Sequence, residues 1–298
     1  MNERVAIIGT GRMGLALGAA LVRSGAADRV VFYGRAIEPP PHPVFDAAAH
    51  QDTEDDEPAV EYRIWPAPLP SGTTVALLAV PDQALPEVAY DLARTGPAPG
   101  GCAALHLAGA LTADVLAPLH DTGYAVGSIH PLQAVADPWL AADRMAGVTF
   151  ALAGEPAAIA AGRRIADALG GYTVLVPPAM RPLYHAGAVL ASNGLVAVLA
   201  AAVRVFEEVG ISEGEAVQGL LPLVRGTLDN LENLGVRGAL TGPVGRGDVD
   251  TVRLHLARLS GQERTLYCAL GMELLRLSRA AGLDPQRAAE MEALLTGG

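Results

Sequence analysis

The sequence predicts an α/β fold in which a doubly wound, mostly parallel sheet is followed by an all-α C-terminal domain. Short apolar runs alternate with helix-like segments through the first half of the chain, as in parallel sheets that are covered by helices. From residue 182 onward only helical patterns follow. Because 298 residues exceed the size at which one hydrophobic core usually stops growing, we expect two domains, over residues 1–178 and 179–298.

The predicted strands are short apolar runs, several of them continuous enough for burial on both faces of a sheet. In chain order they cover residues 4–8, 29–33, 73–80, 102–107, 124–129, 147–153 and 172–176. Predicted helices cover residues 13–23 and 156–169, and then residues 182–209, 213–234, 249–259, 263–281 and 285–295. The segment between the second and third strands contains a proline run and an acidic stretch within residues 39–57. We expect a surface excursion there, and the pattern leaves open whether it is ordered.

The charge balance argues against some classes of partner. With 21 basic and 32 acidic residues the formal net charge is -11, which would repel a phosphate backbone, so we expect no nucleic acid. Arg, Glu, Gly or Pro interrupts the apolar stretches before a spanning length of roughly 20 residues, so we expect no membrane span. The N-terminus lacks the pattern of a secretory signal, and we expect a cytoplasmic protein. Cys102 and Cys268 lack the paired spacing of a metal site, so we expect no metal.

The strongest motif is GTGRMG at residues 9–14, which directly follows the first predicted strand and opens the first predicted helix. In such a Rossmann-type turn the glycines permit a tight turn and a close approach of backbone to pyrophosphate, while the helix N-terminus attracts the anion. We therefore expect a dinucleotide to contact a run of six residues. These are Gly9, Thr10, Gly11, Arg12, Met13 and Gly14.

The end of the second predicted strand reads Gly34-Arg35, where sites that prefer NAD place an acidic residue for the ribose 2′-hydroxyl. A guanidinium there suits the 2′-phosphate of NADP, because arginine presents a planar fork of donors. Val80 and Pro81 end a buried strand, at the edge where open sheets bind ligands. The predicted cofactor is therefore NADP(H), and the alternative is that Arg35 is only a solvated loop residue.

Four motifs follow one another along the chain: HLAGAL at residues 106–111, GSIHPLQ at 127–133, YHAGAVLASN at 184–193 and LTGPVGRGD at 240–248. With them the sequence resembles bacterial proteins that pair a Rossmann-like domain with "domain of unknown function 2520". Those proteins are similar to the wider group of ketopantoate reductase, pyrroline-5-carboxylate reductase and the beta-hydroxyacid dehydrogenases. The resemblance implies hydride transfer from NADPH to a C=O or C=N carbon beside a carboxylate, and a helical domain that forms dimers.

The sequence departs from these relatives in having no lysine at all. Ketopantoate reductase and the beta-hydroxyacid dehydrogenases carry one on the first long helix of the second domain, with an asparagine one turn later. We expect His185 to donate the proton instead, because an unperturbed histidine has a pKa of about 6.5. Ser192 and Asn193 return to roughly the same helix face two turns later. His130, at the end of a predicted strand, is the rival donor, and either histidine could instead be structural.

The remaining candidates are contacts to the cofactor or the substrate. His106 ends another predicted strand, and the small residues after it leave room for the cofactor. Arg181 precedes the first long helix, where relatives often carry a basic residue, and could bind a substrate carboxylate. Further candidates for that carboxylate are Thr241 and Arg246, with Asn230 and Asn233 as weaker additions. The segment around Thr241 also fits a loop and a helix capped by Asp248.

We therefore predict an NADPH-dependent reductase of a small 2-oxo acid, with ketopantoate as the first substrate to consider. Two alternatives stay open: an imine reductase of the pyrroline-5-carboxylate type, and an NADP-binding sensor without turnover. The apolar, alanine-rich helices beyond residue 182 exceed what one small domain needs to cover itself, which indicates a homodimer.

Overall fold

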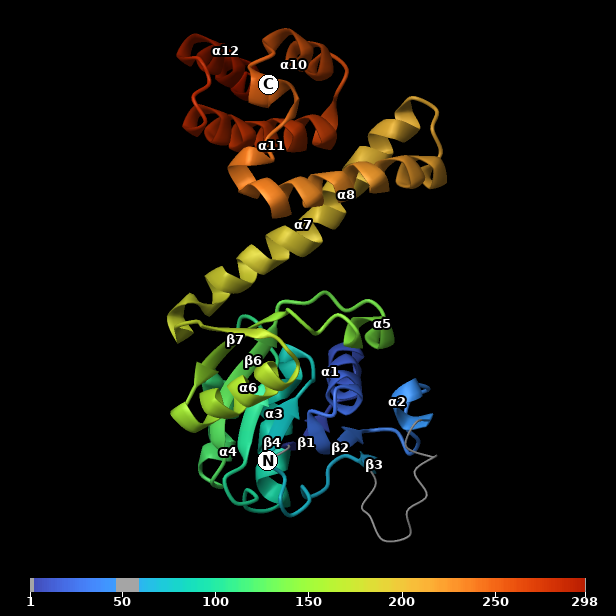
Figure 1. Ribbon diagram of the computed structural model, residues 1–298, viewed down its shortest axis with the longest axis vertical. Helices are drawn as coiled ribbons and strands as arrows, with labels where there is room; N and C mark the ends of the chain where they lie inside the picture. The colour runs from blue at the N-terminus through green and yellow to red at the C-terminus, as the bar shows by residue number, and fades with distance from the viewer. Residues whose placement is uncertain (1–2, 47–58, 298) are drawn as a thin grey trace. The chain divides into compact units, whose positions relative to one another are not determined.

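The computed structural model describes residues 3–46 and 59–297, and the chain forms two compact units, Met1–Ser192 and Asn193–Gly298 (Figure 1). The predicted domain boundary, between residues 178 and 179, lies just before helix α7, Arg181–Glu208. The division between the two units falls inside this helix, so its first turns belong to the first unit.

The first unit contains an eight-stranded sheet with the strand order β3-β2-β1-β4-β5-β6-β7-β8. Neighbouring strands are parallel except for β6 and β7, which are antiparallel. The strands are β1 Glu3–Ile8, β2 Ala27–Gly34, β3 Val60–Ile64, β4 Val75–Leu78, β5 Ala103–His106, β6 Ala125–Pro131, β7 Thr149–Gly154 and β8 Tyr172–Leu175. The predicted mostly parallel sheet is confirmed, and each predicted strand overlaps an observed one.

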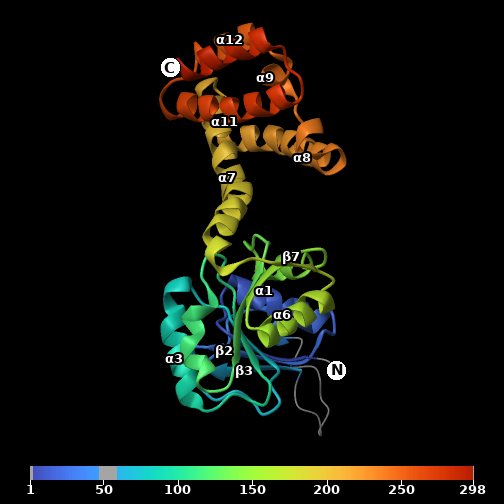
Figure 2. The same cartoon turned by 90° about the vertical axis from the view of Figure 1, so that its left-hand side faces the viewer.

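Helices cover both faces of this sheet, which explains why its central strands are mostly apolar. The covering helices are α1 Arg12–Arg23, α3 Leu85–Thr95, α4 Ala117–His120, α5 Pro138–Ala142 and α6 Pro156–Ala168. α1, α5 and α6 pack on the face that contains Ile7 and Phe32, whereas α3 and α4 pack on the face that contains Ile8 and Tyr33. Figure 2 shows α1 and α6 on one side of the sheet and α3 on the other. The doubly wound arrangement is therefore confirmed as well.

Strand β3 lies inside the segment that the sequence predicts to be a surface excursion, so that part of the prediction is wrong. Its sequence, VEYRI, alternates apolar and polar residues, and only Val60 is fully buried. β3 ends the sheet and pairs with β2 alone, so its burial demands few apolar residues. The short helix α2, Pro43–Asp46, lies in the same segment, and residues 47–57 lie outside the described residues.

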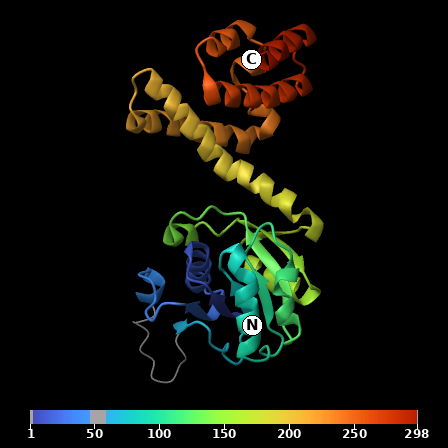
Figure 3. The ribbon, with the colours of Figure 1, turned by 180° about the vertical axis from the view of Figure 1, so that it is seen from behind.

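Every element described in the second unit is a helix, as predicted. After α7 these are α8 Glu213–Gly238, α9 Gly242–Arg246, α10 Val249–Leu256, α11 Gly261–Ala280 and α12 Pro285–Thr296. The predicted cap is confirmed, because the Asp248 side chain accepts a hydrogen bond from the backbone N–H of Thr251 at the start of α10. α10, α11 and α12 pack around Val252, Leu275 and Met291, and these helices are the red and orange group in Figure 3.

Helix α7 is more apolar than the sequence patterns suggest. Within residues 3–46 and 59–297, one helical stretch, Pro178–Glu208, is long and apolar enough to cross a membrane by length and composition. The prediction that every apolar run is interrupted too early is therefore wrong for this helix. Gly187 and Gly194 interrupt the apolar run but carry no charge, and neither ends the helix. Leu183 and Leu190 are exposed on its surface, where a protein partner could cover them.

Candidate active site

The turn between β1 and α1 has a backbone that favours glycine. Gly9 has a φ of 114°, and a Cβ atom there would lie 2.4 Å from the carbonyl oxygen of Ala79. A Cβ atom at Gly14 would lie 2.3 Å from the carbonyl oxygen of Gly9, so α1 packs closely against the turn. No side chain caps α1 at Gly11, which leaves the first N–H groups of the helix available to an anion.

A cavity of about 480 Å³ lies against this turn. Predicted cofactor contacts from three loops line it, namely Gly9, Thr10, Gly11, Arg35, Val80 and Pro81. The other predicted contacts near the turn, Arg12, Met13 and Gly14, form the first turn of α1 and are not part of the lining. The three loops follow β1, β2 and β4, which is the edge where an open parallel sheet usually binds its ligand.

The cavity also has lining residues that the sequence patterns did not single out. They are Trp65, Pro66, Ala84, Glu87, Val88 and Asp91. Trp65 follows β3, whereas Ala84 and Val88 come from the start of α3 and the turn before it. A flat indole and small apolar side chains suit the face of an adenine ring. The sequence patterns did not indicate Trp65 because they did not predict β3. Trp65 reaches the cavity only because β3 pairs with β2.

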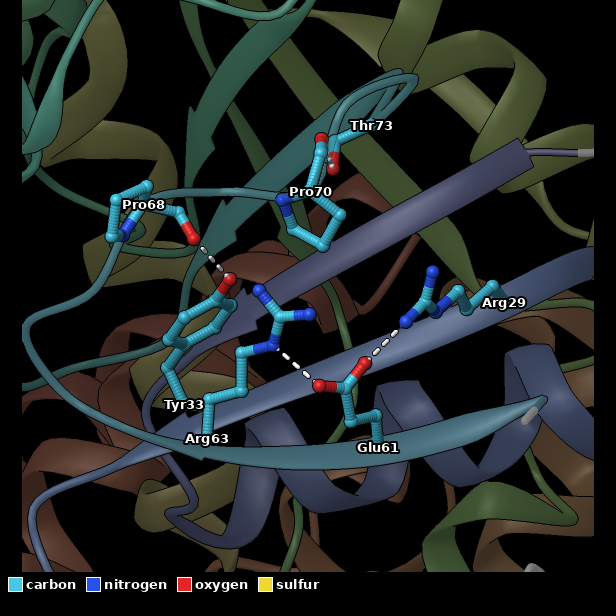
Figure 4. Close-up of polar contacts among 7 residues, drawn as sticks. All are labelled: Arg29, Tyr33, Glu61, Arg63, Pro68, Pro70 and Thr73. Carbon is cyan, nitrogen blue, oxygen red and sulfur yellow. Dashed lines mark hydrogen bonds and ion pairs between the residues drawn. The ribbon is translucent and has the colours of Figure 1, made fainter. Parts of the chain in front are cut away.

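A polar network supports the β2 side of the cavity (Figure 4). Tyr33 lines the cavity, and its phenol donates a hydrogen bond of 3.0 Å to the carbonyl oxygen of Pro68. On the neighbouring strand the Glu61 carboxylate forms ion pairs with Arg29 and Arg63. Burial alone would raise the pKa of Glu61, but hydrogen bonds from the two arginines outweigh it and hold the pKa below its usual value. The network therefore ties β2 to β3 beneath the cavity wall.

A second cluster of polar side chains, all in the first unit, joins the end of β6 to the first turn of α7. Nδ1 of His130 lies 2.9 Å from the phenol oxygen of Tyr184, and the two rings meet edge to face. The His185 ring also meets the His130 ring edge to face, with 5.4 Å between centroids. The two predicted proton donors are therefore neighbours, and one of them, His130, is bonded to Tyr184, which the sequence patterns did not single out.

Gly109, in the loop after β5, allows the two histidines to lie together. A Cβ atom at this residue would lie 2.2 Å from Nδ1 of His185 and 2.9 Å from Nε2 of His130. Burial, with the neighbouring His185 and Arg181, lowers the pKa of His130 to about 4. His130 is therefore a neutral imidazole near neutral pH, where it can donate a hydrogen bond but is not an imidazolium acid.

Arg181 begins α7 with its side chain fully buried. Nη2 donates a hydrogen bond of 2.6 Å to the carbonyl oxygen of Ala108, whereas Nε and Nη1 are buried and find no hydrogen-bond partner among the residues that the structure describes. Burial lowers the pKa of Arg181, yet an arginine stays charged near neutral pH. Because an unpaired buried charge is costly, these two nitrogens suit an anion such as a carboxylate.

His106, a predicted cofactor contact, is fully buried between two backbone groups. Its Nδ1 accepts a hydrogen bond of 3.2 Å from the N–H of Ala108, and its Nε2 lies 3.1 Å from the carbonyl oxygen of Thr112. Burial, followed by the charge of Arg181, lowers the pKa of His106 to about 4. Both nitrogens thus brace the loop that contains Gly109, and we leave His106 out of the proposed cofactor site.

The other predicted residues lie further along the chain. Ser192 is exposed on α7, and its hydroxyl donates a hydrogen bond of 2.9 Å to the carbonyl oxygen of Ala188. Asn193 is the first residue of the second unit. Thr241 directly precedes α9 and Arg246 ends it, so both belong to the second unit. A role of these residues at the substrate stays a prediction.

Two findings concern residues outside both clusters. The weaker substrate candidates, Asn230 and Asn233, lie on α8, where Nδ2 of Asn233 donates a hydrogen bond to the carbonyl oxygen of Asp229. In the described part of the chain, no group of three or more His, Cys, Asp or Glu side chains is placed to hold a metal ion. Cys102 and Cys268 are free thiols.

The parallel sheet, the glycine turn and the cavity beside it define a Rossmann-like protein with a helical C-terminal part. Family models agree with this class: residues 2–131 match the Rossmann-like domain, and residues 148–274 match DUF2520, a domain of unknown function. The chain therefore matches these two domains in this order. The family resemblance predicted from the four motifs is confirmed.

Solved structures share this fold over nearly the whole chain. Protein TM1727 from Thermotoga maritima is 22% identical, with a TM-score of 0.70, over 93% of this chain and 99% of that one. A candidate NADP oxidoreductase from Bacteroides fragilis is 20% identical, with a TM-score of 0.63, over 94% and 97%. Pyrroline carboxylate reductase from Plasmodium falciparum, with NADP bound, is 10% identical, with a TM-score of 0.59, over 99% of both chains. At these identities the likeness shows the fold alone. No curated protein matches the sequence.

Proposed function

We propose that the protein is an NADP(H)-dependent oxidoreductase that reduces the carbonyl group of a small 2-oxo acid. The observation that carries the cofactor is the cavity at the glycine turn, where Arg35 stands at the end of β2 in place of the carboxylate typical of NAD sites. A guanidinium at this point suits the 2′-phosphate of NADP. That proteins of the same fold are described as binding NADP supports the proposal.

The substrate's carboxylate is assigned to Arg181. Its Nε and Nη1 are buried and without a partner among the described residues, and a planar carboxylate offers two acceptors to such a fork. The first turn of α7 then brings the carboxylate close to His185, which follows Arg181 by four residues and so lies about one turn further on. Thr241 and Arg246 remain candidates for further contacts from the second unit.

The carbonyl oxygen needs a proton donor, and the histidine pair at the start of α7 and the end of β6 can provide one. When bound, NADPH supplies a hydride to the carbonyl carbon, and the oxygen then takes up a proton to give a 2-hydroxy acid. We assign that proton to His185. His130, which is neutral near pH 7 because its pKa is about 4, lies against the His185 ring and orients it. In this assignment His185 takes the place of the lysine of the relatives.

Reduction of a cyclic imine is the second candidate. Solved structures of the same fold include pyrroline carboxylate reductase with NADP bound and a reductive aminase from Aspergillus terreus. An iminium substrate arrives already protonated, so it needs less from a proton donor. The two candidates therefore differ in how strongly turnover depends on His185.

The test is NADPH oxidation by the purified protein with a panel of 2-oxo acids, ketopantoate included, and cyclic imines. We expect turnover with a 2-oxo acid. His185→Ala should lower kcat by a factor on the order of 10² while NADPH binding stays nearly intact. His255→Ala, which removes a histidine of the second unit, is the matched control and should leave kcat unchanged.

Each other outcome has a distinct meaning. Turnover of imines alone, with little dependence on His185, would replace the first candidate by the second. Binding of NADPH with no turnover on the whole panel would favour a nucleotide sensor. Absence of binding to either reduced nicotinamide nucleotide would overturn the proposal altogether.

We also propose that the protein is a homodimer. Helix α8 exposes a series of large apolar side chains, namely Leu221, Leu223, Leu228, Leu231 and Leu234. Soluble monomers rarely expose large contiguous apolar surface, and the commonest assembly that covers it is a symmetric dimer. The exposed leucines of α7 add to the apolar surface that a partner subunit would cover.

A further inference from the structure

The contact between Tyr184 and His130 favours one position for the ring hydrogen of His130. A neutral imidazole carries one hydrogen, on Nδ1 or on Nε2, and the partner of one nitrogen decides between them. Burial raises the pKa of Tyr184 to about 12, so the phenol keeps its hydrogen and can donate it. The phenol oxygen lies 2.9 Å from Nδ1 of His130, and with the phenol as donor Nδ1 accepts, so we infer that the hydrogen of His130 is on Nε2.

Nε2 of His130 and Nδ1 of His185 both lie close to Gly109. Both nitrogens crowd the α-carbon of Gly109, where a Cβ atom would clash with each of them. Nδ1 of His185 is buried and has no hydrogen-bond partner in the described part of the chain. Two N–H groups directed to this place would repel each other, so an N–H on Nε2 of His130 favours a lone pair on Nδ1 of His185 and a hydrogen on its Nε2.

We propose that Tyr184 is a positioning residue that sets the tautomers of both histidines, so that His185 presents an Nε2–H to the substrate. The inference rests on the proposed function, in which His185 donates the proton. It adds a direction to the cluster: the Tyr184 phenol donates to His130, and the N–H of His130 lies toward Nδ1 of His185 without yet being bonded to it. A tyrosine that only packed against His130 would give no such order.

This order lets a proton be replaced without forming an imidazolium. As Nε2 of His185 gives its hydrogen to the substrate oxygen, the His185 ring closes on the His130 ring, which lies 5.4 Å away between centroids. Nδ1 of His185, which has no hydrogen-bond partner among the described residues, then takes the Nε2 hydrogen of His130, and Nδ1 of His130 takes the phenol hydrogen. Both histidines end neutral, and the negative charge of the alkoxide ends on the Tyr184 phenolate, which water later reprotonates. The charge of Arg181 favours that phenolate, and the same charge disfavours a protonated His130.

Tyr184→Phe tests the proposal, because it removes the hydroxyl and keeps the ring that packs on His130. Nitrogen-15 NMR of the histidine rings, recorded without substrate, should show the Nε2–H form of His130 in the native protein and a mixture of tautomers in the variant. With substrate, kcat should fall about 10-fold or more while KM for NADPH hardly changes. A change in packing alone would not move the tautomer signals in this way.

The chain contains a matched control. The phenol oxygen of Tyr267 lies 2.8 Å from Nδ1 of His255 in the second unit, and the two rings meet edge to face at 5.7 Å between centroids. Tyr267→Phe should therefore release the tautomer of His255 and leave kcat as it is. If Tyr184→Phe and Tyr267→Phe lower kcat equally, the proposal is wrong.

If Tyr184→Phe folds poorly, the native protein alone still tests the proposal, because its nitrogen-15 spectrum must show the Nε2–H form of both His130 and His185. A double-mutant comparison tests the order of the donors further. His130→Gln removes Nδ1 but places an amide N–H close to the position of Nε2, so the Tyr184→Phe change should cost nothing further in that background. An equal loss in both backgrounds, or an unchanged tautomer of His130 in Tyr184→Phe, would overturn the proposal. The NMR measurement needs no substrate, so a failure of the proposed reaction would leave its result separately readable.

Discussion

Arg35 is the residue on which the choice between the two nicotinamide nucleotides depends. Arg35→Ser removes the guanidinium at the end of β2, and we expect NADPH affinity to fall about 10-fold to 10²-fold, because a charge-assisted pair of hydrogen bonds to phosphate is lost. NADH affinity should hardly change. Calorimetric titration with both nucleotides measures the difference, with Arg163→Ser on the surface of α6 as the control. Equal losses for both nucleotides would show that Arg35 does not contact the 2′-phosphate.

Single residues were predictable from the sequence where a local pattern contains them. Gly9 and Arg35 follow strands at fixed distances, so their place at the cavity could be read from the chain. Tyr184 could not, although it is adjacent to His185, because its role depends on His130, which lies 54 residues earlier. For His106 the sequence pattern gave only its place at a strand end, and its contact with the carbonyl oxygen of Thr112, in the loop that follows, could not be predicted.

At the scale of elements, β2 and β3 are joined through Glu61, and this pairing should depend on pH. The pKa of Glu61 is lower in the folded chain than in the unfolded one, so its contribution to stability is present above the unfolded pKa and is lost as the pH falls through the folded pKa. We expect Glu61→Gln to lower the free energy of unfolding by about 1–3 kcal/mol at neutral pH, and by less in acid.

Urea unfolding at neutral and acidic pH measures this change, and Glu38→Gln, at an exposed carboxylate, is the control. The variant should approach the native protein in stability as the pH falls. A deficit that stays the same across the pH range would mean that the charge of Glu61 is not what stabilises the strand pair.

Strands that bury much apolar surface were predicted from the sequence, whereas a strand that buries little was not. β1, β4 and β5 are buried on both faces, and each contains an apolar run of three or four residues that a pattern can detect. β3 at the sheet edge needs only Val60 fully buried, so its alternating sequence looked like part of a loop. The pairing of β3 with β2, and with it the place of Trp65, is information that only the folded chain contains.

At the scale of the whole molecule, the exposed leucines of α8 predict a dimer. Light scattering after size exclusion should give twice the 30.6 kDa of a single chain. Leu231→Glu, a charge within the apolar series, should shift the protein to the monomer, whereas Glu232→Gln at the next, exposed position should not. A native protein of 30.6 kDa in solution would contradict the prediction.

The sequence predicted the order of the two domains better than the character of the helix between them. The switch from alternating strands and helices to helices alone is a property of long segments, so it survives errors in single elements. The apolar length of α7 was underestimated because glycine was treated as an interruption of an apolar run. A glycine inside a helix weakens it but need not end it, and α7 continues through Gly187 and Gly194.

Gly109 has a consequence for recognising the same arrangement in other genomes. The rings of His130 and His185 can both pack against the loop after β5 only because Gly109 has no side chain. A homologue that keeps both histidines and the tyrosine but has alanine at the position of Gly109 should have lost the paired rings. A sequence pattern that searches for this arrangement should therefore require glycine at the position of Gly109, as well as the tyrosine and the two histidines.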